Sequence, residues 1–119
     1  MILKTILLVD DSKTFIEALS YSLKNKFLNV ITAFNVEEAI DNIKKIKFDV
    51  IISDYDMGSD NGLTILKFLK NNNYNSKFIL LTGNSSVELK ENTEKLNGIF
   101  LDKGDLNLVT SLQLEINNC

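Results

Sequence analysis

Five short apolar runs, each followed by a segment long enough for a helix, restrict the fold of this chain more than any other feature. The runs are Thr5–Val9, Val30–Ala33, Val50–Ser53, Phe78–Leu81 and Ile99–Leu101. Continuous apolar runs of this kind are typical of strands buried on both faces of a parallel sheet. Strands that alternate with helices form right-handed crossovers. The sequence therefore predicts an α/β fold, a doubly wound five-stranded parallel sheet with five helices, forming one domain over residues 1–119.

The segments between the runs carry apolar residues at helical spacing. The first predicted helix has one apolar face, made of Phe15, Ile16, Leu19, Leu23 and Phe27. Ser12 and Asn35 stand where N-caps of the first two helices are expected. The third helix is predicted from about Leu63 to the Asn71-Asn72-Asn73 turn, and the fourth over residues 86–96. The fifth is predicted from about Asp105, with a core stripe of Leu106, Val109, Leu112 and Ile116.

Polar residues follow four of the apolar runs, at the points where the predicted strands end. They are Asp10, Asp11, Asp54, Thr82 and Lys103. The carboxyl ends of parallel strands meet at one edge of a sheet, outside which open α/β sheets bind their ligands. Two carboxylates about 4 Å apart repel by roughly 4 kcal/mol at an effective dielectric constant of 20. Three of them at one edge require a cation or the loss of a charge, and an all-oxygen site favours Mg²⁺.

The same residues suit phosphoryl transfer to a carboxylate. A carboxylate can act as the nucleophile, while Lys103 and the Thr82 hydroxyl could contact the phosphoryl oxygens. Taken singly, each residue has an ordinary explanation. The Asp10-Asp11 pair can cap a helix, Asp54 can belong to a turn, Thr82 can be structural and Lys103 can be solvated. Their occurrence together, at successive strand ends, points to a phosphoryl-transfer site.

Composition excludes several other classes of site. The chain has no His and no Arg, its net charge is −3, and its one cysteine is Cys119. A Ser-His-Asp triad, a phosphohistidine and an internal disulfide are therefore impossible. A nucleic-acid surface would need clustered basic residues, so no direct nucleic-acid partner is expected. No apolar stretch is long enough to span a bilayer and no signal peptide is recognisable, so we expect a cytoplasmic protein without a membrane partner.

On these residues the chain resembles the receiver domain of two-component response regulators, the group that includes the chemotaxis regulators, and the resemblance extends over essentially all 119 residues. The motifs that carry it are Val9-Asp10-Asp11-Ser12, Ile52-Ser53-Asp54-Tyr55-Asp56-Met57 with Gly62 beyond it, Leu81-Thr82-Gly83 and Phe100-Leu101-Asp102-Lys103. The resemblance implies the flavodoxin-like (βα)5 arrangement. It also implies a signalling switch, and not a metabolic enzyme, that catalyses only its own phosphorylation and dephosphorylation.

The resemblance implies a role for each motif residue. Asp54 is the expected phosphoacceptor. Asp11 and Asp54 are expected to bind Mg²⁺ directly, Asp10 through water, and Asp56 through its backbone carbonyl. Two further roles concern the phosphoryl group: Lys103 would bind one of its oxygens, and Thr82 would form a switch pair with Phe100. The variable positions that flank the phosphoryl group in this family are occupied by Asp56 and Asn84.

The sequence departs from the family pattern at two positions. Gly104 stands where the family usually has a proline after the lysine, and Gly58 replaces a second proline. A cis peptide bond costs about 2.5–4 kcal/mol without proline, so a trans or a strained bond is expected after Lys103. Two alternatives remain at this point: a Mg²⁺-dependent aspartyl-phosphate phosphatase of the haloacid-dehalogenase type, and a receiver-like module that binds partners independently of phosphorylation.

The expected partners follow from the resemblance. A sensor histidine kinase or a phosphotransfer protein would supply the phosphoryl group. A downstream protein would bind the face formed by the fourth helix, the fifth strand and the fifth helix, which could also support a phosphorylation-dependent dimer. On the fifth helix, Leu108 and Leu114 fall outside the predicted core stripe. They are therefore expected to be exposed and to contribute to that binding face.

Overall fold

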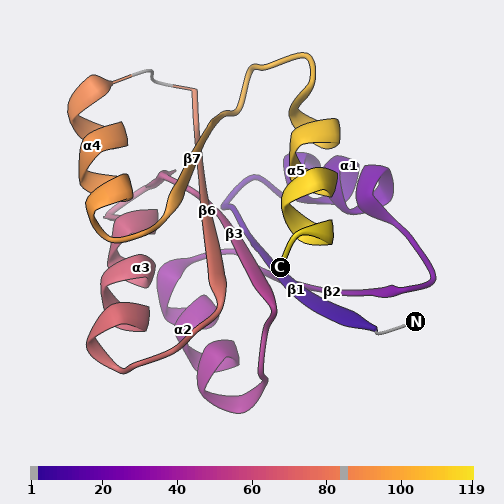
Figure 1. Cartoon of the computed structure of the whole chain (residues 1–119), viewed down its shortest axis with the longest axis horizontal. Coiled ribbons are helices and arrows are strands. Elements are labelled where there is room, and N and C mark those ends of the chain that lie inside the picture. Colours follow the sequence, from indigo (N-terminus) through magenta and orange to yellow (C-terminus); the bar gives the residue numbers. More distant parts are fainter. Residues whose placement is uncertain (1–2, 84–85) are drawn as a thin grey trace.

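The strands form one central sheet in a computed structural model that describes residues 3–83 and 86–119 (Figure 1). The large sheet contains β1 (Lys4–Val9), β2 (Leu28–Ala33), β3 (Val50–Asp54), β6 (Lys77–Thr82) and β7 (Ile99–Asp102). The helices are α1 (Lys13–Leu23), α2 (Val36–Lys45), α3 (Gly62–Asn71), α4 (Val87–Lys95) and α5 (Leu108–Asn117). A two-stranded antiparallel hairpin, β4 (Asp56–Met57) and β5 (Asp60–Asn61), separates β3 from α3.

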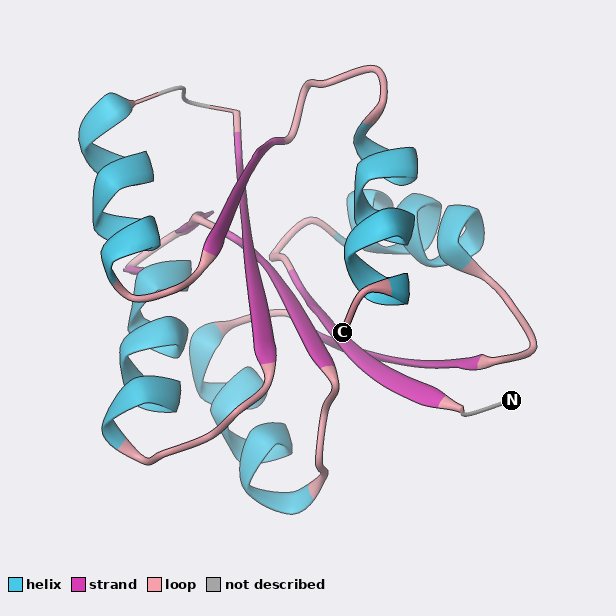
Figure 2. Cartoon of the chain, in the orientation of Figure 1, coloured by secondary structure: helices cyan, strands magenta, loops and turns pink. Residues whose placement is uncertain are grey.

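All neighbours in the large sheet are parallel, and their order is β2-β1-β3-β6-β7. The chain starts near the middle of the sheet, winds outward to β2, and then returns through β3 to the other edge. The predicted doubly wound, five-stranded parallel sheet with five helices is therefore confirmed. Figure 2 shows the strands as the middle layer between two layers of helices.

The two helix layers bury different faces of the sheet because successive strand residues point to opposite sides. Leu7 and Val9 of β1 belong to the core beneath α2, α3 and α4. Ile6 and Leu8 of the same strand belong to the core beneath α1 and α5. In Figure 1 these two groups of helices lie on either side of the sheet. Both strand faces are buried, which explains why the strands read as unbroken apolar runs.

The predicted N-caps are confirmed. The Ser12 hydroxyl accepts a hydrogen bond from the backbone N–H of Phe15 at 3.2 Å, and the Asn35 side chain accepts one from Glu38 at 2.7 Å. The peptide bond between Lys103 and Gly104 is trans, since no cis bond occurs within residues 3–83 and 86–119. In the same ranges, no helix is both long and apolar enough to cross a membrane.

Two predicted helix boundaries are wrong. The first helix ends at Leu23, and Phe27 lies in a turn in which its N–H donates to the Asn25 side chain. The fifth helix begins at Leu108 instead of about Asp105, because residues 105–107 form a turn held by the Asp105 carboxylate and carbonyl. Leu106 is consequently fully exposed, whereas Leu108 is buried. The prediction that Leu108 is exposed is therefore wrong, and the one for Leu114, 58% exposed, is confirmed.

Gly62 is the position where α3 approaches β3 and β6 most closely. A Cβ atom there would lie 2.5 Å from the Asp54 backbone oxygen and 2.7 Å from Leu80 Cδ1. We expect Gly62→Ala to lower the free energy of unfolding by about 1–3 kcal/mol, the usual range for overpacking, as measured by urea denaturation. Gly83→Ala is the control, because nothing lies within 4 Å of its added Cβ. A Gly62→Ala protein as stable as wild type would contradict this close approach.

Candidate functional site

The acidic residues at the strand ends come together at the carboxyl edge of the sheet. Asp10 directly follows β1, and Asp54 is the last residue of the neighbouring strand β3. One carboxylate oxygen from each of Asp10, Asp11 and Asp54 lies within 4.8 Å of the others. Asp10 and Asp54 are buried, whereas Asp11 is exposed. The structure thus brings together the three carboxylates that the sequence placed at strand ends.

Lys103 brings a positive charge into this cluster from the edge strand β7. Its Nζ atom donates a hydrogen bond to Asp10 Oδ2 at 2.7 Å and lies 3.5 Å from Asp54 Oδ1. The backbone N–H of Lys103 donates to the Thr82 carbonyl at 2.9 Å, which anchors the lysine beside the end of β6. The ammonium group therefore offsets part of the repulsion between the two buried carboxylates.

Local hydrogen bonds fix the carboxylates in place. The Ser12 backbone N–H donates to Asp10 Oδ1 at 2.8 Å, so the turn that caps α1 also orients Asp10. The Ser53 hydroxyl donates to the Asp54 carbonyl at 2.9 Å, and the Tyr55 N–H donates to the Leu81 carbonyl at 2.8 Å. The backbone on both sides of Asp54 is thereby held.

The electrostatics of the cluster shift two pKa values. Burial is the main cause that raises the pKa of Asp54 to about 6, the neighbouring charge of Asp10 raises it further, and Lys103 opposes both effects. For Lys103, burial alone would lower the pKa. The hydrogen bond to Asp10 and the charges of Asp54 and Asp10 outweigh it, so the pKa of Lys103 is raised. Lys103 is therefore a permanent cation beside a carboxylate that ionises near neutral pH.

The other residues singled out in the sequence lie around this cluster. Thr82 is buried at the end of β6, and Phe100 is a half-buried residue of β7 that packs against the core beneath α2, α3 and α4. Asp56 is exposed in β4. Asn84, the second variable position, lies outside the described residues. Thr82 therefore borders the acidic cluster on the β6 side.

One neighbour of the site was not predicted as such. The sequence places Phe15 on the apolar face of α1, yet the Lys103 Nζ atom lies over its ring, 4.1 Å from the centroid. The first turn of α1 starts at the same sheet edge as Asp10. An aromatic residue in that turn is therefore expected near the strand ends, so the sequence could have indicated that Phe15 lies close to the site.

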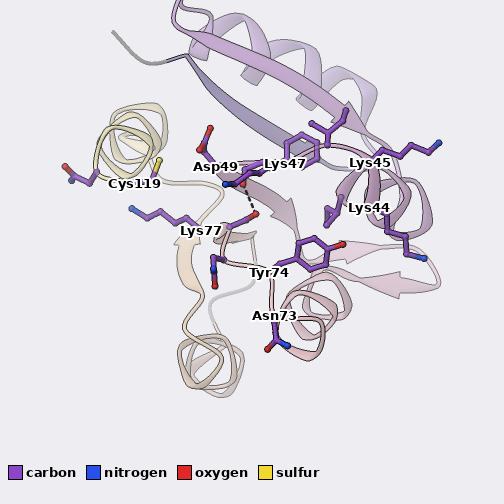
Figure 3. A pocket seen from close by; sticks show the side chains of 14 residues that line it. Lys44, Lys45, Lys47, Asp49, Asn73, Tyr74, Lys77 and Cys119 are labelled. Carbon is purple, nitrogen blue, oxygen red and sulfur yellow. Dashed lines mark hydrogen bonds between the residues drawn. The ribbon is translucent and has the colours of Figure 1, made fainter.

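A hollow of the described surface lies at the opposite end of the sheet. It has a volume of about 710 Å³ and is lined by the segments before β3 and β6 (Figure 3). Four lysines line it, but Lys77 forms an ion pair with Glu115 at 2.7 Å and Lys44 lies over the ring of Phe68. In Figure 3 the Lys45 side chain points away from the hollow. None of the residues of the acidic cluster lines this hollow, and few charged side chains converge on it.

Comparison with known proteins agrees with this geometry. The family model for the response regulator receiver domain matches residues 6–101 of the chain. That segment includes Asp10, Asp11, Asp54 and Thr82 and ends just before Lys103. The chain therefore belongs to the receiver domains of response regulators, the signalling domains of two-component systems that are phosphorylated on an aspartate with Mg²⁺. The haloacid-dehalogenase alternative is set aside by this family assignment.

Individual relatives support the same assignment. The cell cycle transcriptional regulator CtrA of Caulobacter vibrioides is 27% identical over 88 residues, which cover 74% of this chain and 38% of CtrA. The chain thus matches well under half the length of that relative.

Two solved structures extend the comparison. The chemotaxis protein CheY4 of Vibrio cholerae has a TM-score of 0.83 and 27% identity, with 95% of this chain and 97% of CheY4 covered. A Burkholderia pseudomallei response regulator with a phosphorylated aspartic acid, a calcium ion and citrate has a TM-score of 0.78 and 25% identity, with 94% and 72% covered. The likeness to CheY4 extends over nearly the whole of both chains.

The raised pKa of Asp54 predicts a pH dependence of stability. The ordinary pKa of this carboxyl is 3.8 and its folded value is about 6. Between about pH 4 and 6 the folded state binds more protons than the unfolded state, so the free energy of unfolding falls as pH rises through this window. Asp54→Asn removes this dependence and should stabilise the metal-free protein by about 1–3 kcal/mol at pH 7.5 and much less at pH 4. Urea denaturation with a chelator measures both values, and equal stabilisation at the two pH values would contradict the prediction.

Proposed function

We propose that Asp54 accepts a phosphoryl group from a histidine kinase or a phosphotransfer protein, and that the modified domain signals through a changed surface. One observation carries this proposal: the buried Asp54 carboxylate ends β3 within 4.8 Å of ligand atoms from two other carboxylates and 3.5 Å from Lys103. A nucleophile, a cation site and a fixed positive charge are then present at one sheet edge. The phosphorylated aspartic acid named for the Burkholderia pseudomallei structure supports the same chemistry.

The transfer is a displacement at phosphorus. One Asp54 carboxylate oxygen attacks, an O–P bond forms, the donor's P–N or P–O bond breaks, and the donor leaves with the bonding electron pair. With a pKa of about 6, Asp54 is predominantly ionised at pH 7 and can attack. Its burial leaves the carboxylate incompletely hydrated, which lowers the cost of desolvating the nucleophile. Hydrolysis of the acyl phosphate by water would later return the domain to its initial state.

The donor set fits a magnesium ion. The converging ligand atoms of Asp10, Asp11 and Asp54 are all carboxylate oxygens, and two of the three carboxylates are buried beside one another. Oxygen ligands of this kind, completed by waters and phosphoryl oxygens, are what Mg²⁺ prefers. We assign Asp11 and Asp54 as direct ligands, Asp10 as a ligand through water, and the Asp56 carbonyl as the fourth protein group. Mg²⁺ bound there supplies positive charge for the carboxylates and the phosphoryl oxygens.

Two residues would receive the new negative charge. Phosphorylation adds about −1.5 to −2 charges and three acceptor oxygens. Lys103 can turn its ammonium group from Asp10 toward a phosphoryl oxygen, since it already lies 3.5 Å from Asp54 Oδ1. The Thr82 hydroxyl is the second proposed donor. Movement of Thr82 toward the phosphoryl group would leave space into which the half-buried Phe100 ring turns, so Thr82 and Phe100 form the proposed switch pair.

The proposed output surface is the face formed by α4, β7 and α5. Large apolar side chains are exposed along this part of the chain: Val87 is 73% exposed, Leu106 fully and Leu114 58%. Leu106 and Leu114, and not Leu108, are therefore the leucines available to a downstream protein or to a second copy of the domain. Phe100 belongs to β7 in the middle of this face, which gives the switch pair a direct route to the surface.

The proposal predicts a Mg²⁺-dependent acyl phosphate on Asp54. Incubation with acetyl phosphate and Mg²⁺ should add one phosphoryl group to the wild-type protein, as measured by intact-mass spectrometry. The added mass should be absent with a chelator and in Asp54→Asn, whereas Asp60→Asn, an exposed carboxylate in β5, should behave as wild type. A folded wild-type protein that gains no mass and does not turn over the donor would instead favour a module that binds partners independently of phosphorylation.

A further inference from the structure

Lys103 has an aromatic neighbour in addition to its two carboxylates. Its Nζ atom lies over the ring of Phe15, 4.1 Å from the centroid, at the same time as it contacts Asp10 and approaches Asp54. The face of an aromatic ring attracts a cation, and the attraction grows when water is partly excluded. Here the ammonium group is partly buried, with 23% of the Lys103 side chain exposed. The ring therefore covers a side of the ammonium group that would otherwise face solvent.

Four contacts link the Phe15 ring to the acidic cluster, and together they form a closed loop that begins and ends at Asp10. The Ser12 N–H donates to Asp10 Oδ1 at 2.8 Å, and the Phe15 N–H donates to the Ser12 hydroxyl at 3.2 Å. The Phe15 ring then faces Lys103 Nζ, and Lys103 returns to Asp10 Oδ2 at 2.7 Å. Because Phe15 also packs against the core beneath α1 and α5, its ring cannot move freely. The start of α1 thus sets where the ammonium group of Lys103 can lie.

Such a restraint matters because the hydrogen bond from the Lys103 N–H to the Thr82 carbonyl holds the backbone but leaves the long side chain free to rotate. Lys103 follows β7 and precedes Gly104, which has no side chain, and its flexible stem must reach past the ends of β6 and β3 toward the end of β1. A lysine side chain has many rotamers, and holding it in one of them costs conformational entropy. Without a neighbour on its open side, the ammonium group would spend more time in water and less beside Asp54.

We propose that Phe15 is a positioning residue for phosphoryl transfer: its ring holds the Lys103 ammonium group between Asp10 and Asp54, where an incoming phosphoryl oxygen would meet it. The effect on transfer rests on the proposed function of Asp54. The effect of Phe15 on the position of the Lys103 ammonium group does not depend on that function, and it can be measured in the metal-free protein without a phosphodonor.

The first test is the position of the lysine in solution. Nuclei above an aromatic ring are shifted upfield, so the ε-methylene protons of Lys103 should resonate upfield of the ordinary lysine position. Phe15→Leu should remove this shift. Phe27→Leu is the matched control, because its ring also lies under a lysine, Lys26 at 5.2 Å, but away from the acidic cluster. Ordinary Lys103 shifts in a folded wild-type protein would overturn the proposal.

The second test is the rate of phosphoryl uptake from acetyl phosphate with Mg²⁺. Phe15→Leu should slow uptake about three- to tenfold, the range of a partly desolvated cation–π contact, and Phe27→Leu should leave it unchanged. In a Lys103→Met background, Phe15→Leu should have no further effect, because its action passes through the lysine. A fluorinated phenylalanine at position 15 keeps the shape of the ring but weakens its attraction for a cation, and it should also slow uptake.

The outcomes separate the two proposals. A wild-type rate in Phe15→Leu, or an equal slowing in the presence and absence of Lys103, would overturn the role of Phe15 while leaving Asp54 as the acceptor. A wild-type protein that takes up no phosphoryl group would overturn the proposed function, and the position of Lys103 relative to Phe15 would then be decided by the NMR shifts alone.

Discussion

The site depends on the balance between two buried carboxylates and one lysine. Asp10 and Asp54 lie close enough to repel each other, and burial deprives both of water. Burial, and in second place the charge of Asp10, raise the pKa of Asp54 to about 6, because Lys103, 2.7 Å from Asp10 and 3.5 Å from Asp54, offsets these two effects only in part. A site left with an excess of negative charge favours both a divalent cation and the ammonium group. The excess negative charge that lowers the stability of the folded protein therefore also favours the binding of cationic ligands at the site.

The topology of the sheet brings the carboxylates and the lysine together. Parallel strands carry Asp10, Asp54 and Thr82 to one edge of the sheet, and the edge strand β7 delivers Lys103 to the same place. The crossover helices cover both faces, so the strand ends are buried from the sides and open only at the edge. Phe15, near the start of α1, has its ring beneath the Lys103 ammonium group at this edge.

The sequence predicted the sheet and the clustering of the strand-end residues well, because strands buried on both faces read as apolar runs and the carboxyl ends of parallel strands meet at one edge of the sheet. It predicted two helix boundaries less well, the end of the first helix and the start of the fifth. The predicted stripe included Leu106 and left out Leu108, and the turn held by Asp105 reverses which of the two is buried. Phe15 shows a different limit: helical spacing identified it as apolar and inward-facing, but the contact with Lys103 depends on two segments distant in sequence.

A crystal structure of the protein with Mg²⁺ and beryllium fluoride, a stable mimic of the phosphoryl group, shows whether the three carboxylates and Lys103 act together on a group bound to Asp54. We expect the beryllium fluoride group on Asp54, the metal ion held by the acidic cluster, and the Lys103 ammonium group turned from Asp10 to a fluorine atom. A metal ion bound away from Asp10, Asp11 and Asp54, or an Asp54 side chain without the adduct at saturating ligand, would contradict this expectation.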